Sequence, residues 1–142
     1  MVPSYVYKHF QSVTIRELVH QIVMNLLLKL EHVAILIACY CISLYLGYAW
    51  WLFFALLLLP DISMVGYAIN NKWGALLYNL FHHQGIALVV IGVGWYTAQP
   101  IVLLTGIILL GHSAMDRTFG YGLKYTTSFQ DTHLGKIGKN VN

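Results

Sequence analysis

The chain has 142 residues, of which 58% are hydrophobic and only 9% are charged. Soluble domains carry about 25% charged residues, so this composition excludes an ordinary soluble protein. A net charge of +3, spread among apolar stretches, is too small to indicate a nucleic-acid-binding surface. The apolar runs are about as long as a bilayer is thick, which predicts an integral membrane protein.

The first predicted helix is amphipathic and covers residues 14–29, after an N-terminal segment of residues 1–12. Thr14, followed three residues later by Glu17, is typical of a capping box at a helix N-terminus. Apolar residues from Ile15 onward recur at helical spacing, with charged and polar residues on the other face. We expect this helix to lie on the membrane surface or to extend the first span.

Four apolar segments follow, and each is long enough to cross a bilayer as a helix. They cover about residues 30–48, 50–69, 73–97 and 100–116. The tail, residues 117–142, is rich in Gly, aromatic and polar residues, which predicts a short folded flap or a mobile end. The fold class predicted for residues 1–142 is therefore all-α, a single-domain four-helix bundle in the membrane.

All Lys and Arg residues fall on one side of this predicted topology. The eight are Lys8, Arg16, Lys29, Lys72, Arg117, Lys124, Lys136 and Lys139. The two loops on the opposite side carry none of them. Because loops rich in Lys and Arg stay in the cytoplasm, both termini and the tail are predicted to be cytoplasmic.

Ionisable side chains inside the predicted spans are costly in lipid and are therefore candidates for a functional site. They are Glu31, Asp61, His82, His83, His112 and Asp116. Counted from the outer end of each span, most of them lie about 18 to 24 Å deep at the helical rise. Four helices are thus predicted to contribute to one polar layer. Within it, His112 and Asp116 are four residues apart and share a helix face.

The second and third spans add polar neighbours to this layer. Pro60 is expected to kink the second span and to open space around Asp61, and Ser63 follows close by. In the third span, a polar stripe is formed by Tyr78, Asn79 and His82. His83 is displaced from His82 by about 100° around the helix, so one of the two histidines should point inward.

Histidine nitrogens and carboxylate oxygens are the ligands that zinc, or a pair of iron or manganese ions, takes in proteins. We predict a divalent metal site, with zinc favoured, whose ligands are Asp61, His82, His112 and Asp116. A water bound to the metal has a lowered pKa and could attack an ester, amide or phosphoester, with Glu31 or Asp116 as catalytic base. The predicted function is a metal-dependent hydrolase of a lipid-like or small amphipathic substrate that enters from the membrane.

Three other hypotheses fit the same residues. The polar groups could hydrogen-bond across helices and serve only to hold the bundle together. The carboxylates could titrate in a proton-coupled transporter, for which four spans would usually require a homodimer. A haem between facing histidines such as His83 and His112 would indicate electron transfer.

Three basic residues near the predicted cytoplasmic boundary are further candidates. Arg117 could reach lipid head groups or pair with a carboxylate. Lys124 could bind a lipid phosphate, although basic residues after a last span are also ordinary membrane anchors. His133 in the tail could fold back to cap the site, with solvent exposure as the equal alternative.

Several motifs, in order along the chain, resemble those of one known family. They are LLPDISMVGY at 58–67, YNLFHH at 78–83, GHSAMDRTFGYGLKY from residue 111 and SFQDTHLGKIG through residue 138. From about residue 27 onward the chain closely resembles small bacterial membrane proteins described as domain of unknown function 4260. The resemblance implies a location in the bacterial cytoplasmic (inner) membrane and supplies no activity. The recurring polar positions that it implies are Asp61, Ser63, Tyr78, Asn79, His82, His112, Asp116, Arg117, Lys124, Thr132 and His133.

A second, looser resemblance concerns the site alone. An intramembrane cluster of His and Asp with a nearby Ser is similar to the zinc site of the alkaline ceramidase and progestin-receptor group of hydrolases. This chain departs from that group because it lacks the seven spans and the HxxxH pair.

Overall fold

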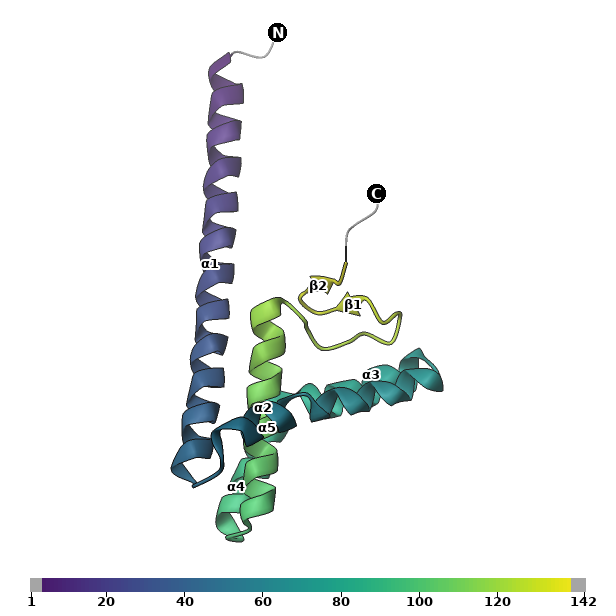
Figure 1. Cartoon of the computed structure of the whole chain (residues 1–142). Helices are drawn as coiled ribbons and strands as arrows, with labels where there is room; N and C mark the ends of the chain where they lie inside the picture. The colour runs from purple at the N-terminus through teal and green to yellow at the C-terminus, as the bar shows by residue number, and fades with distance from the viewer. Residues whose placement is uncertain (1–3, 139–142) are drawn as a thin grey trace.

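The computed structural model describes the backbone of residues 4–138 and the side chains of residues 14–138. This part of the chain is mostly helical and ends in a small hairpin (Figure 1). The elements in order are α1 (Ser4–Tyr45), α2 (Trp50–Leu57), the 3₁₀ helix η1 (Leu59–Ala68), α3 (Asn71–His82), α4 (Gln84–Tyr96), α5 (Pro100–Phe119), β1 (Asp131–Thr132) and β2 (Gly135–Lys136).

Three helical stretches of the described chain are long and apolar enough to cross a membrane. They are α1 from Thr14 onward, α2 together with η1, and α5. α3 and α4 meet the same criterion only as a pair, which is bent by 50° at the break between them. The predicted third span, residues 73–97, is therefore not one straight helix. Three or four helices of this kind are consistent with a membrane protein.

α1 is one continuous helix and is longer than predicted. The predicted helix start at Thr14 is wrong, because the backbone is already helical at Ser4. No proline or glycine occurs from Ser4 to Tyr45, so nothing in the sequence separates the amphipathic part from the first span. The helix ends where Gly47 takes a left-handed conformation (φ +85°). There the N–H groups of Gly47 and Tyr48 donate hydrogen bonds to the carbonyls of Leu44 and Ser43 in the last turn.

α5 lies at the centre of the helices. α1 and α4 pack along it, α2 and α3 also contact it, and η1 packs against α3. In Figure 1, α1 and α5 run side by side, α3 leaves them at a steep angle, and the hairpin of β1 and β2 lies near the C-terminal end of α5. Because α5 is covered by several neighbours, its polar residues His112, Ser113 and Asp116 are buried.

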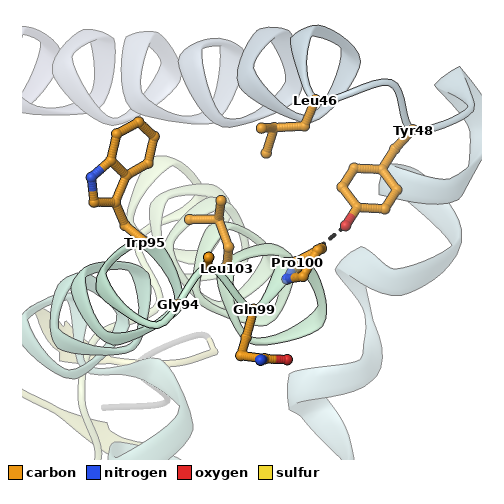
Figure 2. Close-up of a pocket in the computed structure, with 8 residues that line it drawn as sticks. Leu46, Tyr48, Gly94, Trp95, Gln99, Pro100 and Leu103 are labelled. Carbon is orange, nitrogen blue, oxygen red and sulfur yellow. Dashed lines mark hydrogen bonds between the residues drawn. The ribbon is translucent and has the colours of Figure 1, made fainter.

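α4 and α5 come into close contact through glycine. Gly94 on α4 lies against the backbone of Leu103 on α5, as Figure 2 shows. A Cβ atom at position 94 would clash with that backbone. Beside this contact, the hydroxyl of Tyr48 donates a hydrogen bond to the carbonyl of Pro100 at 3.1 Å. Small residues let helix backbones approach closely in membranes, and Gly94 has this role here.

We expect Gly94→Ala to lower the stability of the protein, whereas Gly92→Ala on the same helix should not. The alanine methyl group at position 94 would meet the backbone of Leu103, and overpacking of this kind costs about 1–3 kcal/mol. Position 92 has open space around it, and a helix favours alanine over glycine by about 1 kcal/mol. Thermal unfolding of the detergent-purified variants measures both effects. Equal unfolding midpoints would argue against a close α4–α5 contact.

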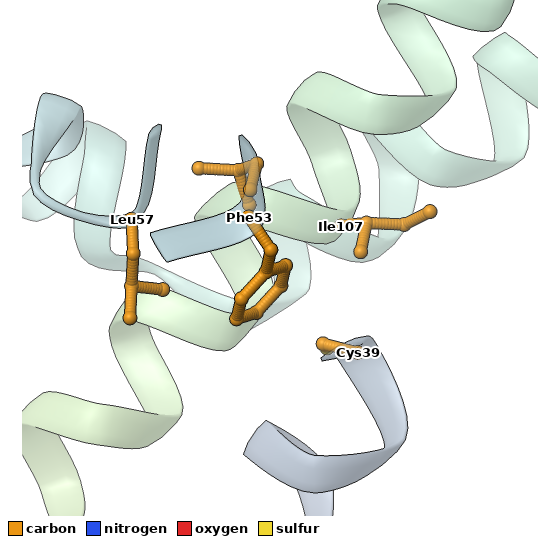
Figure 3. Close-up of a cluster of buried hydrophobic side chains, with 5 residues drawn as sticks. Cys39, Phe53, Leu57 and Ile107 are labelled. Atoms are coloured by element: carbon orange, nitrogen blue, oxygen red, sulfur yellow. The ribbon is translucent and has the colours of Figure 1, made fainter. Parts of the chain in front are cut away.

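A small hydrophobic cluster joins α1, α2 and α5. Its buried members are Cys39, Phe53, Leu57, Ile107 and Ile108. In Figure 3 the side chain of Cys39 on α1 faces the ring of Phe53 on α2. Van der Waals packing of such side chains favours the association of these elements, because lipid is as apolar as the side chains themselves. The cluster fixes the end of α2 beside α5, at the point where η1 begins.

The tail after α5 folds back as a short antiparallel hairpin. Asp131 is paired with Lys136 between β1 and β2, and Thr132 also forms a bridge with Lys124. Asn79 on α3 holds this segment, because its side chain accepts a hydrogen bond from the Lys124 amide at 2.7 Å and donates one to the Lys124 carbonyl at 2.9 Å. The tail is thus a folded flap, and its described residues form no further helix.

Candidate metal centre

Pro60 determines the local structure at the start of the site. Proline has no N–H and its ring disfavours a continued α-helix, so the chain tightens into the 3₁₀ helix η1. The N–H of Asp61 consequently bonds the carbonyl of Leu58 at 3.2 Å instead of that of Leu57. The Leu57 carbonyl is left free, and it accepts a hydrogen bond from Nδ1 of His112 at 2.6 Å.

The break between α3 and α4 separates two adjacent histidines. His82 ends α3 and is fully buried, whereas His83 is exposed and caps α4 by accepting the Ile86 N–H through Nδ1 at 3.4 Å. His82 is therefore the histidine that points inward. Its own carbonyl accepts hydrogen bonds from the hydroxyl of Ser113 at 2.6 Å and from the guanidinium of Arg117 at 3.2 Å.

Four side chains from η1, α3 and α5 converge at one point. The Nε2 atoms of His82 and His112 are 2.8 Å apart. Oδ1 of Asp61 lies 3.5 Å and 3.4 Å from these two nitrogens. The carboxylate oxygens of Asp116 lie 3.6 Å and 3.8 Å from the same nitrogens. Both imidazoles are completely buried.

Hydrogen bonds on the outer side of each ring select the tautomer of the two histidines. Nδ1 of His82 lies 2.8 Å from the carbonyl of Tyr78, and Nδ1 of His112 faces the carbonyl of Leu57. Because a carbonyl only accepts, each Nδ1 carries the hydrogen, and Nε2 of the neutral ring holds a lone pair. Two lone pairs and two carboxylates thus face one another in a space that is buried except on the side of Asp61. This arrangement is favourable only with a positive charge between them, supplied by a metal ion or by a shared proton.

The distances fit a metal ion well. Asp61, His82 and His112 each offer one ligand atom, and these atoms all lie within 4.8 Å of one another. Around a tetrahedral zinc ion, ligand atoms at about 2.0–2.1 Å from the metal stand about 3.3–3.4 Å apart. The two Asp61–histidine distances agree with this value. The two histidines would need to separate by about 0.5 Å to reach it.

Asp116 contacts both histidines but stands outside this group of three. Its Oδ2 accepts a hydrogen bond from the Tyr78 hydroxyl at 2.6 Å. The Tyr78 ring also stacks on the imidazole of His82, with ring centroids 3.6 Å apart. Tyr78 therefore orients both the carboxylate and one imidazole. Asp116 can serve as a fourth ligand or as a proton acceptor beside the metal.

The site is accessible from the side of Asp61. The Asp61 side chain is 38% exposed, whereas both imidazoles are inaccessible. An apolar cavity of about 320 Å³ lies beside it, and Pro60, Phe81 and Leu109 are among its lining residues. Pro60 directly precedes Asp61, and Phe81 directly precedes His82. The four clustered side chains are not among its lining residues, so the cavity adjoins the cluster through the residues that precede Asp61 and His82.

Glu31 does not belong to the group of candidate ligands, and Ser63 forms no hydrogen bond with that group in the described part of the chain. Glu31 is exposed on α1, and among the described residues the candidate metal ligands do not include it. Equal depth in the membrane does not fix the direction in which a helical side chain points, so the predicted layer lacks a contribution from α1. Ser63 is buried in η1, and its hydroxyl has no hydrogen-bond partner within the described part of the chain.

Asn79 and Lys124 connect α3 with the tail. The Lys124 backbone exchanges two hydrogen bonds with the Asn79 side chain. The Lys124 side chain is buried and donates from Nζ to the Phe129 carbonyl at 2.8 Å. Nζ also lies 3.9 Å from the centroid of the Phe129 ring. Burial lowers the pKa of Lys124, and the charge of Asp116 acts in the opposite direction. Both residues hold the flap in place and are not among the candidate ligands.

His133 and Arg117 lie where the tail returns to the end of α5. Nδ1 of His133 accepts a hydrogen bond from the amide of Leu123 at 2.8 Å. Burial lowers the pKa of His133, and the positive charge of Arg117 lowers it further. Arg117 also donates to the carbonyls of Tyr121 and His82, so it links the tail to the end of α3.

Sequence reasoning missed two contributors to the site. Ser113 supports the carbonyl of His82, and its position directly after His112 was an available signal. The carbonyl of Leu57 orients His112, but a backbone group carries no signature of its own in a sequence. The only indication in the sequence is Pro60, three residues after Leu57, because a proline has no N–H to bond a carbonyl of the preceding turn.

The comparison with known families gives one match. The model of the family described as Domain of unknown function (DUF4260) matches residues 25–137. No curated protein and no solved structure matches the chain. The matched region is more than half of the chain and includes η1, α3, α5 and the hairpin, so every member of the cluster lies inside it. The chain belongs to the DUF4260 family.

Proposed function

We propose that this protein is a membrane-embedded metalloenzyme that hydrolyses a lipid-like or small amphipathic substrate. The single observation that carries the proposal is the pair of Nε2 atoms of His82 and His112, which face each other at 2.8 Å with Asp61 beside them. Both rings are held by Nδ1 hydrogen bonds, so the nitrogens are arranged to bind a cation. Zinc is the favoured ion, with iron or manganese as alternatives.

Hydrolysis at this centre would depend on a bound cation, and two features of the chain support it. A divalent cation bound there would supply Lewis acidity and activate water. Asp116 lies next to both histidines and can accept the proton, while Tyr78 holds its carboxylate in place. The exposed carboxylate of Asp61 and the apolar cavity beside Pro60 provide a route for a substrate from the lipid. We place the protein in the bacterial inner membrane with both termini in the cytoplasm, in line with the distribution of Lys and Arg.

The metal content of the full-length, detergent-purified protein tests this proposal. Elemental analysis is expected to find about one zinc, iron or manganese ion per chain. The same preparation should cleave a long-chain p-nitrophenyl ester or bis(p-nitrophenyl) phosphate in mixed micelles, and chelation should abolish the reaction. Absence of a stoichiometric metal would contradict the metal centre. A bound metal without cleavage of any probe would contradict the hydrolase while leaving the metal centre in place.

A proton relay is the second candidate, because the distance between the two Nε2 atoms is also that of a hydrogen bond. A single proton shared by His82 and His112 would neutralise the repulsion of their lone pairs, and Asp61 could exchange it with the surroundings. Liposomes that contain the protein should then show pH-dependent flux that Asp61→Asn abolishes. This candidate predicts no stoichiometric metal, so elemental analysis separates it from the enzyme. In this case a homodimer would be expected to provide the pathway.

The geometry gives less support to a haem site. His83 is exposed and caps α4, and Nε2 of His112 is turned toward His82. Two axial nitrogens of a haem iron stand about 4 Å apart with the macrocycle between them, and 2.8 Å leaves no room for it. The visible spectrum of the purified protein is therefore expected to lack a haem band.

A further inference from the structure

A second cavity, of about 480 Å³, lies among α1, the start of α4, the end of α5 and the tail. In Figure 1 the C-terminal end of α5 lies between α1 and the hairpin of β1 and β2. The polar residues that line the cavity are Asn25, Lys29, His32, Gln84, Arg117 and His133. None of them is a candidate metal ligand, so this cavity is distinct from the site described above.

The charge of this cavity is positive. Lys29 and Arg117 provide two cations. No carboxylate occurs among the lining residues that the structure describes. Glu31 is close to Lys29 in sequence but does not line the cavity. Positive charge in a recess that no lining carboxylate balances attracts a negatively charged ligand.

Some hydrogen-bond donors of the residues that line the cavity also lack acceptors. Nε2 of Gln84 is shielded from solvent and has no hydrogen-bond partner in the described residues, although buried amide groups are normally paired. His133 accepts the Leu123 amide through Nδ1, so in the neutral ring its Nε2 carries the hydrogen and is free to donate. Two guanidinium nitrogens of Arg117 donate hydrogen bonds to carbonyls. A guanidinium has five N–H groups, so Arg117 still has N–H groups that can donate to a ligand.

The cavity lies where the last apolar span ends. Arg117 is in the last turn of α5, and the tail begins directly after that helix. Ends of spanning helices lie at the level of the lipid head groups, and clustered Lys and Arg at this level attract anionic lipids. Several N–H donors from different elements suit a group with three or more acceptor oxygens better than a single carboxylate.

We propose that this cavity binds a phosphate group, carried either by the head group of an anionic phospholipid or by free phosphate. Lys29 and Arg117 supply the charge, and Gln84 and His133 donate directed hydrogen bonds to the phosphate oxygens. The binding joins α1 to the end of α5 and to the tail. It requires neither a metal at the other site nor any hydrolytic activity, so the two proposals can fail independently.

Lipid binding to the full-length protein in detergent micelles tests this proposal. Native mass spectrometry should show one phosphatidylglycerol retained per chain, with much weaker retention of phosphatidylcholine, whose head group has no net charge. Addition of inorganic phosphate distinguishes the two sources: displacement of the lipid at micromolar phosphate identifies free phosphate as a ligand, and resistance to millimolar phosphate identifies the lipid. Equal retention of the two lipids, together with no binding of phosphate, would overturn the proposal.

A matched pair of variants locates the site. Lys29→Gln should weaken phosphatidylglycerol binding about fivefold, because one Lys or Arg near the membrane surface contributes about a fivefold gain in affinity for anionic lipid. Lys72→Gln removes the same charge from the start of α3, away from the cavity lining, and should leave binding unchanged. Gln84→Leu should weaken binding without any change of net charge. Both lysines are exposed, so neither substitution is expected to affect folding. Equal effects of Lys29→Gln and Lys72→Gln would overturn the assignment to this cavity.

Discussion

His82→Ala is expected to remove the bound metal from the purified protein, whereas His83→Ala is expected to leave the metal content unchanged. The two residues are adjacent, but only the side chain of His82 points toward His112 and Asp61. Loss of a residue that merely orients a metal ligand costs about 10–100-fold in metal affinity. Loss of the ligand itself should cost at least about 100-fold, so little metal should survive purification. Elemental analysis of the two variants and the wild type measures the difference.

The adjacent histidine is a demanding control. His83→Ala removes the cap of α4, and loss of a cap costs about 1 kcal/mol of stability. Its unfolding midpoint should therefore fall slightly while its metal content stays at the wild-type level. His82→Ala should in addition expose Asp61 and Asp116 to each other without a cation, which adds to its instability. Equal loss of metal in both variants would indicate a general folding defect, and full retention in both would exclude His82 as a ligand.

The residues that meet at the centre were predictable to the extent that helical spacing determines them. His112 and Asp116 share a face because they are four residues apart, and the structure brings both of them to His82. The number of residues between the outer end of each span and Asp61 or His82 predicts a similar depth in the membrane for these two side chains. This procedure works because the rise per residue of a helix is nearly constant.

The same procedure fails where rotation around the helix axis matters. Glu31 has the correct depth, but its side chain is exposed on α1. After Glu31 the apolar residues of α1 surround the helix, so their pattern does not indicate which side faces α5. The choice between His82 and His83 was open for a related reason, because it depends on where α3 ends.

The break between α3 and α4 illustrates a second limit. The segment from about residue 73 to residue 97 is apolar apart from a polar group at Asn79, His82, His83 and Gln84, and it contains no proline. A single span was therefore the expected result. The break instead relies on tertiary contacts, because the free carbonyl of His82 is satisfied by Ser113 and Arg117 from α5. Hydrogen bonds between distant segments cannot be read from a local pattern.

Asp116→Asn is expected to leave the metal in place and to reduce hydrolysis of the probe esters by about 100- to 10,000-fold, the usual contribution of a general base. The metal should stay because Asp61, His82 and His112 form the group of candidate ligands without it. Asparagine has the same shape, and its carbonyl oxygen can still accept the hydrogen bond from Tyr78. What the variant lacks is a carboxylate that can take up a proton.

The comparison with Asp61→Asn and Asp131→Asn separates a base from a ligand. Asp61→Asn should lower metal content and hydrolysis together, because Asp61 belongs to the candidate ligands. Asp131→Asn changes an acidic residue of the tail whose partners are Thr127 and Lys136, so metal content and hydrolysis should both remain. If Asp116→Asn instead lost its metal in parallel with Asp61→Asn, Asp116 would be a fourth ligand, and the proton acceptor would have to be another group. Retention of full activity by Asp116→Asn would exclude both roles, because neither a base nor a ligand tolerates loss of the carboxylate without effect.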